Sequence, residues 1–316
     1  MSEMIDLKDP ALDAVHGPAK AGMGAIWAGM ICIYIAWGST YLAMRFAIQT
    51  MPPFLMAAAR FLIAGGLLYA WQRLSGVAAP TRRQWRSALI VGLFLLLGGN
   101  GLVVWSEQRV PSGIAALMVG STPLWMVLID GLRQRRLPSG RVALGILIGL
   151  VGMAVLVGPS QLTGLHGDID PAGAALLTLA ALSWAAGSLY SRKADLPQSP
   201  FLYNGMEMLC GGGALLLLGS FTGEWSLVHL GSISSASWLG FAYLVVFGSL
   251  IGFSTYTWLL RSAPTTLVST YAYVNPIVAV IIGNLLAQEP LTPRVLLAAA
   301  VIVGGVVLIT LSGSKK

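Results

Sequence analysis

Charged residues are scarce in this chain: they make up 10% of its 316 residues, whereas 56% are hydrophobic. A soluble domain carries roughly 25% charged residues, so this scarcity excludes an ordinary water-soluble protein. Cysteine and histidine are also rare. Cys32 and Cys210 lie in the middle of apolar segments, and His16, His166 and His229 fall in the polar tail or in loops. This pattern provides no disulfide framework and no metal motif. Because HExxH and P-loop motifs are missing too, we expect no metal, no cofactor and no enzyme activity.

Apolar segments fill most of the chain. A helix needs about 20 apolar residues to cross the hydrocarbon of a membrane, and the sequence predicts an all-α membrane protein with ten such helices. The predicted spans are 23–46, 54–72, 85–106, 111–131, 140–158, 170–191, 200–221, 236–260, 264–287 and 292–312. The first 22 residues are polar and acidic and lack the basic start of a signal peptide. We interpret residues 1–22 as a disordered cytoplasmic tail.

The net charge of +7 is distributed unevenly between the predicted loops. If the N-terminus is cytoplasmic, fifteen of the nineteen basic residues fall on that side: Lys8, Lys20, Arg73, Arg82, Arg83, Arg86, Arg133, Arg135, Arg136, Arg141, Arg192, Lys193, Arg261, Lys315 and Lys316. Arg45, Arg109 and Arg294 fall outside. This positive-inside bias predicts a multi-pass membrane protein with both termini in the cytoplasm. It also explains the basic balance without a nucleic-acid partner.

The sequence contains one internal repeat. At an offset of 153, Trp85, Gly99 and Pro123 match Trp238, Gly252 and Pro276. At offsets of 147 and 149, Pro53-Phe54-Leu55 matches Pro200-Phe201-Leu202, and Gly38-Ser39-x-Tyr41 matches Gly187-Ser188-x-Tyr190. Each copy holds five spans, and an odd number places the second copy upside down in the membrane. We therefore predict two inverted five-helix repeats, at 23–158 and 170–312, an architecture that is frequent in secondary transporters.

Two charged residues lie clearly within predicted spans. Arg60 in span 2 and Glu207 in span 7 occupy the same repeat position, seven residues into their spans. Intramembrane charge is costly and usually functional, so Arg60 could hold a carboxylate and Glu207 could exchange a proton or hold an amine. The alternative is that each is satisfied by neighbouring helices and reaches toward its interface. Glu107 and Asp130 lie at span ends, where interfacial positions are expected.

Matched prolines interrupt spans 4 and 9. Pro123 and Pro276 each remove a helical hydrogen bond, which would free the carbonyl groups of Val119 and Ala272 near the membrane centre. The polar residues beside the two prolines are Ser121, Thr122, Tyr271, Tyr273 and Asn275. A pair of kinked helices with polar groups at mid-depth predicts a substrate site with hinges at both prolines. The alternative is that the prolines only bend packed helices.

Further candidates for substrate binding come from spans 1, 3 and 6. Asn100 lies among three glycines in span 3, and Trp37, Tyr41, Trp184 and Ser188 surround the repeated Gly-Ser motif. Aromatic side chains deep in a span can surround a ring or an ammonium group. The alternatives are helix–helix hydrogen bonding by Asn100 and ordinary packing by the aromatic residues.

Small residues spaced by four occur in spans 5 and 10. Gly145 and Gly149 form a GxxxG motif, and Ala300 and Gly304 form a similar pair. Such motifs favour close helix contacts, either within the bundle or in a homodimer through spans 5 and 10. The other expected partners are a small-molecule substrate and the lipid bilayer.

The chain resembles the EamA-type carriers of the drug/metabolite transporter superfamily over roughly residues 25–312. The resemblance rests on the two sets of five spans, the Trp37-Gly38-Ser39-Thr40-Tyr41 opening, Arg60, the segment 111–116 and the segment 271–276. It implies a location in a bacterial inner membrane, a bundle with spans 1–4 and 6–9 around a central cavity, and export of amino acids or related metabolites. One acid and one base inside the membrane suit a zwitterion carried by alternating access. Two other functions stay open: efflux of cationic drugs with proton exchange at Glu207, and a scaffold or sensor that transports nothing.

Overall fold

All regular secondary structure in the described part of the chain is helical. The structure is a computed structural model, and it describes residues 22–135, 139–157, 170–263, 265–268 and 270–313. The predicted tail up to residue 21, the loop 159–169, and Arg136, Lys315 and Lys316 lie outside these ranges. The prediction of an all-helical protein is therefore confirmed for the described residues.

The helices follow the predicted order of spans. The first half contains α1 (Met23–Gly38), α2 (Thr40–Ala47), α3 (Pro53–Leu74), α4 (Arg82–Gly92), the π-helix η1 (Leu93–Gly101), α5 (Leu102–Ser106), α6 (Ser112–Val119), α7 (Thr122–Gln134) and α8 (Gly140–Val157). The second half contains α10 (Pro171–Ser191), α11 (Pro200–Phe221), the short 3₁₀ turns η2 (Glu224–Leu227) and η3 (Leu230–Ser232), α12 (Ser235–Tyr243), the π-helix η4 (Leu244–Ile251), α13 (Gly252–Ser262), α14 (Thr265–Val268), α15 (Tyr271–Ala287) and α16 (Pro293–Gly313).

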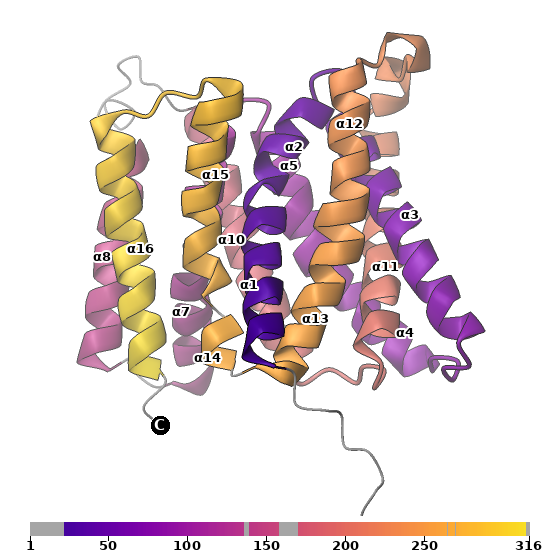
Figure 1. Cartoon of the computed structure of the whole chain (residues 1–316), viewed down its shortest axis with the longest axis horizontal. Helices are drawn as coiled ribbons and strands as arrows, with labels where there is room; N and C mark the ends of the chain where they lie inside the picture. Colours follow the sequence, from indigo (N-terminus) through magenta and orange to yellow (C-terminus); the bar gives the residue numbers. More distant parts are fainter. Residues whose placement is uncertain (1–21, 136–138, 158–169, 264, 269, 314–316) are drawn as a thin grey trace, which may run out of the picture.

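Among the described residues, seven continuous helices are long and apolar enough to cross a membrane, and three shorter apolar helices accompany them. The shorter ones are Gly140–Leu156, Tyr271–Ala287 and Pro293–Ile309. Helix α1 begins and α16 ends at the same edge of the bundle, the lower edge in Figure 1. We call this edge the terminus side, and we call the opposite edge, where α2 and α15 end, the far side.

Local signals explain where several helices begin. Pro53, Pro171 and Pro200 stand in the first turns of α3, α10 and α11, where the missing N–H group has no helical partner to lose. Helix α4 begins with a capping box in which Thr81 and Gln84 bond each other's backbone N–H groups. These starts lie close to the predicted ones because the signals depend only on neighbouring residues.

Glycines allow two pairs of helices to lie against each other along their length. Helix α3 runs beside α11, and α8 runs beside α16 (Figure 1). A Cβ atom on Gly65 would lie 2.9 Å from the carbonyl oxygen of Gly205, and one on Gly305 would lie 2.8 Å from that of Gly145. Because the backbones themselves approach so closely, these positions exclude larger side chains.

Span 3 and span 8 both contain a π-helix, and in each of them a tryptophan side chain from another span packs against a glycine. The Trp37 indole lies against Gly252, where a Cβ atom would be 2.3 Å from its nitrogen. In the same way, Trp184 lies against Gly99, where a Cβ atom would be 2.7 Å from the nearest carbon of the indole ring. The predicted weakening of span 3 by its glycines therefore takes the form of the π-helix η1, a distortion that often occurs at functional sites.

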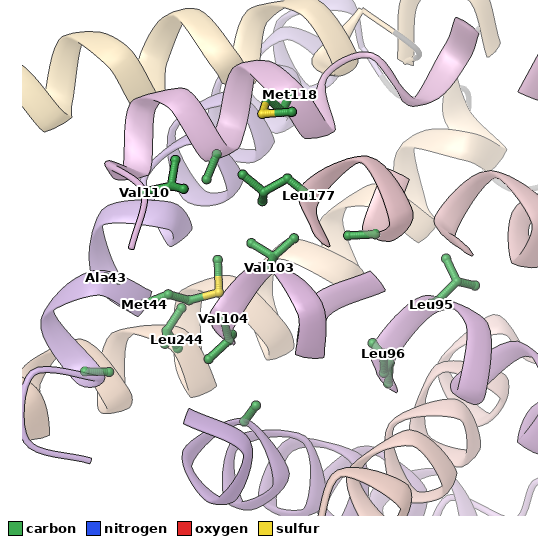
Figure 2. Packing of buried hydrophobic residues seen from close by; sticks show 14 of the residues in the cluster. Ala43, Met44, Leu95, Leu96, Val103, Val104, Val110, Met118, Leu177 and Leu244 are labelled. Atoms are coloured by element: carbon green, nitrogen blue, oxygen red, sulfur yellow. The ribbon is translucent and has the colours of Figure 1, made fainter. Parts of the chain in front are cut away.

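The largest buried cluster lies toward the far side of the bundle. Figure 2 shows Met44 from α2, Val104 from α5 and Leu244 from η4 gathered together. All three side chains are at most 3% exposed. Burial of apolar surface stabilises a folded protein by roughly 25 cal/mol per Å². These contacts therefore help to hold spans 1, 3 and 8 together where α2, α5 and η4 meet.

The GxxxG motif of span 5 is used within the chain. Gly145 faces Gly305 and Ile309 of α16, and Gly149 faces Leu124 of α7. The predicted partner motif in span 10 is displaced by one residue, because Gly304 is exposed with open space around it whereas Gly305 makes the contact.

Gly305 and Gly304 provide a matched test of this packing. We expect Gly305→Ala to lower the free energy of unfolding by about 1–3 kcal/mol, the cost of overpacking, because its methyl group would meet the backbone of α8. Gly304→Ala should be neutral or slightly stabilising, since the space there is open and alanine favours the helix. Thermal unfolding in detergent measures both variants, and equal unfolding temperatures would contradict the described helix contact.

Candidate functional site

A cavity of about 600 Å³ lies inside the bundle. Helices from both halves of the chain contribute to its wall. The residues proposed from the sequence that line it are Trp37, Tyr41, Arg60, Asn100, Thr122, Pro123, Trp184, Ser188, Glu207, Tyr271, Asn275 and Pro276. Residues from seven of the predicted spans are thus brought to one place, although they are separated by up to 239 positions in the sequence (276 − 37).

The cavity reaches the surface on the terminus side. Ser191 and the exposed Arg192, at the end of α10, belong to its wall. At the other end it stops at Met44, Val103 and Ala116, which are at most 5% exposed. The cavity is therefore accessible from one side of the bundle and closed toward the other.

Arg60 is held in place by span 8. Its side chain is 4% exposed, and its Nε donates a hydrogen bond of 2.9 Å to Ser249 Oγ. The guanidinium group lies against Gly248, where a Cβ atom would be 2.9 Å from its terminal nitrogen. The carbonyl of Gly248 also accepts a bond of 3.2 Å from Trp37 Nε1. Since Ser249 uses only one of the five guanidinium N–H groups, an anionic ligand in the cavity would find donors available.

Glu207 also lies in the cavity wall, on α11, the helix that runs beside α3. It is 5% exposed, and the hydroxyl of Tyr203, one helical turn earlier, hydrogen-bonds to its carboxyl group. Asn204, on the same face of the helix, donates a bond of 3.0 Å to Thr257 Oγ1 of α13. Tyr203, Asn204 and Thr257 also line the cavity but were not predicted. The spacing of three and four residues from Glu207 places Asn204 and Tyr203 on its helix face, so the sequence did contain a signal for them.

Four aromatic rings form a cluster in the cavity wall. Trp37 lies 5.4 Å from Phe253, 5.1 Å from Tyr256 and 5.2 Å from Tyr271, measured between ring centroids. Tyr256 and Tyr271 contact each other at 5.5 Å. Most of these contacts are edge-to-face, the arrangement that aromatic pairs prefer. A cluster of this kind presents both π faces and hydroxyl groups to a ligand.

The kinked spans 4 and 9 meet at Pro276. Span 4 is interrupted between α6 and α7, and a Cβ atom on Gly120 at this break would lie 2.6 Å from Pro276 Cγ. In the neighbouring turn, Asn275 is 8% exposed, and its Oδ1 has no hydrogen-bond partner among the described residues. An unbonded buried acceptor in a cavity wall favours a ligand that donates a hydrogen bond.

The prediction that the carbonyl group of Val119 is free is wrong. This oxygen accepts a hydrogen bond of 2.6 Å from Thr122 Oγ1. The bond forms because a threonine hydroxyl three residues along a helix reaches the backbone oxygen that the break exposes. Val119 therefore offers a ligand less bonding capacity than the sequence suggested.

Two predicted residues lie outside the cavity wall. Ser121 is fully buried. Its hydroxyl donates a hydrogen bond of 2.5 Å to the Met118 carbonyl and accepts one of 3.2 Å from Trp125 Nε1. Tyr273 turns away from the cavity and packs with the cluster of Leu124 and Ile146 between α7, α8 and α16. On a helix, neighbours two positions apart point in different directions, which separates Tyr273 from Tyr271 and Asn275.

A polar network that was not predicted from the sequence joins the helices on the far side. Glu289, just after α15, accepts bonds of 2.8 and 2.9 Å from the N–H groups of Ser112 and Gly113 at the start of α6, and a third of 2.6 Å from the Ser112 hydroxyl. It is also paired with Arg45 of α2. Burial raises the pKa of Glu289, but the bonds from Ser112, Gly113 and Arg45 outweigh burial and lower it below its ordinary value. We call these four residues the far-side network.

A second carboxylate joins the two halves at the far side. Glu224 accepts bonds of 3.2 and 2.9 Å from the N–H groups of Phe54 and Leu55 at the start of α3. Burial raises the pKa of Glu224, and these two backbone bonds partly oppose that rise. Both carboxylates accept hydrogen bonds from N–H groups at a helix start, which have no partner within the helix. A single sequence does not reveal such a bond when the acid is more than 100 residues away.

Glu107 lies at the end of its span, as predicted, but its side chain is buried within the protein. Glu107 follows α5, and its side chain is 5% exposed because the surrounding far-side helices cover it. Asp130, by contrast, is partly exposed and accepts a bond of 2.7 Å from Gln134.

In the described part of the chain, no group of three or more His, Cys, Asp and Glu residues could hold a metal ion.

A smaller cavity of about 330 Å³ lies on the terminus side. Arg83 and Arg86 of α4, Arg133 of α7 and Lys193 beyond α10 surround it. The basic residues that the positive-inside bias places in the cytoplasm thus gather on the side where the described chain begins and ends.

Comparison with known proteins agrees with this architecture. Residues 22–158 and 171–311 match the EamA-like transporter family. The chain is 39% identical over 290 residues to the inner membrane transporter YedA of Escherichia coli (strain K12), and the aligned region covers 90% of each chain. It is 27% identical to the transporter sll0355 of Synechocystis sp. (strain ATCC 27184 / PCC 6803 / Kazusa), over 83% of each chain. The chain therefore belongs to the EamA-like transporter family, as the resemblance in sequence predicted.

The fold also occurs in a solved crystal structure. Its TM-score with this chain is 0.61 at 22% sequence identity, and the match covers 94% of this chain and all of the other. At that level of identity the likeness concerns the arrangement of helices alone.

The far-side network predicts a pH-dependent contribution to stability. Because the pKa of Glu289 is lowered in the folded protein, its contribution is complete above the ordinary carboxyl pKa and is lost as the pH falls through the lowered value. We expect Glu289→Gln to cost about 1.5–3 kcal/mol, typical of hydrogen bonds to a charged group. Chemical unfolding in detergent at several pH values measures both effects.

Asp170→Asn is the matched control, because Asp170 is paired with Arg109 on the same side at 3.4 Å and is more exposed. An exposed pair contributes about 0–1 kcal/mol. If Glu289→Gln and Asp170→Asn had equal effects, the network would not hold the far side together.

Proposed function

We propose that the chain is a secondary transporter that exports small zwitterionic metabolites, amino acids or close relatives, across the bacterial inner membrane by alternating access. The observation that carries this proposal is the cavity itself. It is accessible from one side only, and it has a buried base, a buried acid and an aromatic cluster in its wall. Family membership supports transport as the activity.

The two halves of the bundle would be inverted repeats. Several contacts occur twice with matching partners: Trp37 against Gly252 and Trp184 against Gly99. The pairs α3–α11 and α8–α16 each join corresponding spans of the two halves, and spans 3 and 8 both contain a π-helix. An inverted pair of five-helix units brings the start and end of the ten-span chain to one side of the membrane, in agreement with Figure 1.

A zwitterion fits the charges of the cavity. Arg60 has free N–H groups for a carboxylate, and the Glu207 carboxyl group and Asn275 Oδ1 would accept hydrogen bonds from an ammonium group. The cluster of Trp37, Tyr256 and Tyr271 would add cation–π attraction. A ligand with two opposite charges leaves neither buried group uncompensated, which a singly charged ligand would do.

Alternating access requires one side to open as the other closes. In this structure the terminus side is open, and the far side is closed by the apolar end of the cavity and by the far-side network. Spans 4 and 9 would bend at Pro123 and Pro276, which lie in the cavity wall beside the substrate. A proline kink is a position where a helix can bend without breaking further hydrogen bonds.

The basic residues favour a cytoplasmic terminus side. Arg83, Arg86, Arg133 and Lys193 lie there around the smaller cavity, as the positive-inside rule requires of cytoplasmic loops. The structure would then be the form that loads substrate from the cytoplasm. The exposed Ala300 and Gly304 of α16 leave a small-residue face at which a homodimer through spans 5 and 10 could form.

The second candidate is efflux of cationic drugs with proton exchange at Glu207. The aromatic cluster around Trp37 favours it, since such clusters bind organic cations. Arg60 in the same cavity opposes it, because a cationic ligand would be repelled by a second positive charge.

Transport in proteoliposomes distinguishes these functions, using a panel of amino acids and organic cations with and without a pH gradient. We expect Arg60→Met and Glu207→Gln each to slow amino-acid transport by about 10- to 100-fold, the equivalent of a lost charged hydrogen bond. Cys210→Ser, one turn beyond Glu207 on α11 and outside the cavity wall, should leave transport unchanged.

Each alternative gives a different result in the same assay. Efflux of cationic drugs predicts that Glu207→Gln abolishes transport while Arg60→Met preserves or improves it. A scaffold or sensor predicts that the wild-type chain moves no compound of the panel. Either result would contradict zwitterion export.

A further inference from the structure

Glu107 is a buried acid that the central cavity does not use. Its side chain is 5% exposed, and neither Oε1 nor Oε2 has a hydrogen-bond partner among the described residues. The other three buried glutamates are all bonded: Glu207 by Tyr203, Glu224 by two backbone N–H groups and Glu289 by the far-side network. An unbonded buried carboxyl group therefore sets Glu107 apart and needs a physical explanation.

The charged groups near Glu107 are already engaged elsewhere. Arg45 and Tyr41 of α2, Arg60 of α3 and Glu289 are the titratable groups that act on it electrostatically. Arg45 is paired with Glu289, and Arg60 donates to Ser249.

Within its own segment, Arg109 is also turned away from Glu107. Its guanidinium lies 4.8 Å from the centre of the Trp105 ring and 3.4 Å from Asp170 at the start of α10. Glu107 thus has cations in its surroundings but no direct partner among the described residues.

The position of Glu107 links the cavity to the far-side network. Val103, one helical turn earlier, forms part of the closed end of the cavity, and Tyr41 and Arg60 line the cavity as well. Arg45 and Glu289 belong to the network that closes the far side. Glu107 therefore lies among the residues that must move if the far side opens.

An ionised carboxylate is costly in this position. Removing a carboxylate from water is costly even after the protein relaxes, and here no hydrogen bond or ion pair among the described residues offsets that cost. A neutral carboxyl group avoids most of it. Opening of the far side would bring water to Glu107 and would release Arg45 from Glu289, and both changes favour the ionised form.

We propose that Glu107 is a proton-binding site that holds its proton while the far side is closed and loses it when the far side opens. The inference rests on the proposed function, which makes the far side the outer side of the membrane. A proton from outside would bind to the Glu107 carboxylate after the substrate has left. The neutral side chain would then permit closure and return the empty carrier to its cytoplasm-facing form.

The direction of the pH dependence follows from linkage. The closed form holds one more proton than the open form, so closure is favoured at low pH and is lost as the pH rises. A single proton can change the ratio of closed to open forms by at most about tenfold per pH unit. Because Glu207 lies in the cavity and accepts a bond from Tyr203, it would respond to substrate and to the cytoplasmic side rather than to closure of the far side.

Spin labels on the far side test the proposal. Cysteines at Gln49 and Leu286, both exposed, report the separation between the ends of α2 and α15, the elements that Arg45 and Glu289 join. Cys32 and Cys210 are first replaced by serine. In lipid nanodiscs at acidic pH, we expect one short distance in the otherwise wild-type chain. A longer distance should gain population by up to about tenfold per pH unit as the pH rises.

Glu107→Gln should keep the short distance at every pH, because glutamine has nearly the same shape and cannot ionise. Glu107→Asp, which keeps a titratable group, should retain the pH response with a shifted midpoint. Asp170→Asn, which removes an exposed carboxylate on the same side, should respond as the wild type does. A Glu107→Gln chain that opens with pH like the wild type would overturn the proposal, as would a wild type whose distances ignore pH.

Transport measurements separate this inference from the function on which it rests. If zwitterion export is correct and Glu107 binds the proton, acidification of the outer side should accelerate wild-type export but not that of Glu107→Gln. Export that is equally accelerated in both chains would refute the role of Glu107 alone. A wild type that transports nothing would refute the proposed function itself.

Discussion

Hydrocarbon contains no water to bond a polar side chain, and this constraint decides where the polar residues of the chain lie. Arg60, Asn204 and Glu207 could not face lipid at an acceptable cost. Instead they are buried and line one cavity between the two halves, together with Trp37 and Asn275. The lipid-facing surface consists of residues such as Leu144 and Leu297, which are more than half exposed.

The same constraint explains the difference between the two sides of the bundle. On the far side, Glu289 and Glu224 each bond the start of a helix that is distant in sequence, so the helix ends there are joined. On the terminus side, the cavity passes between Arg192 and neighbouring residues to the surface. Buried hydrogen-bonded carboxylates are costly to separate, so in the proposed mechanism they would make closure of the far side a distinct state. A transporter needs such a state for each direction of access.

Much of the architecture was predictable from the sequence because it depends on local patterns. Hydrophobic segments, proline starts and the capping box at Thr81 indicate helices without knowledge of their neighbours. Arg60 and Glu207 were recognisable because charge is rare inside a span. Pro276 was recognisable because it matches Pro123.

The remaining features depend on contacts between distant segments. Nothing in the sequence around Glu289 indicates that it bonds the start of α6, 176 residues away. Glu107 appeared interfacial because it follows a span, and only the packing of other helices buries it. Tyr273 was grouped with Tyr271 and Asn275 because all three are polar neighbours, yet helix geometry turns it toward α7 and α8.

Access to the cavity is the most direct test of the account. A cysteine at Ser188, in the cavity wall, can be introduced into a chain that lacks Cys32 and Cys210. We expect a membrane-impermeant thiol reagent to modify it from the side of the chain termini, and a transported zwitterion to slow that modification. Modification from the opposite side alone, or at a rate that no transported compound changes, would contradict a one-sided substrate cavity between the two halves.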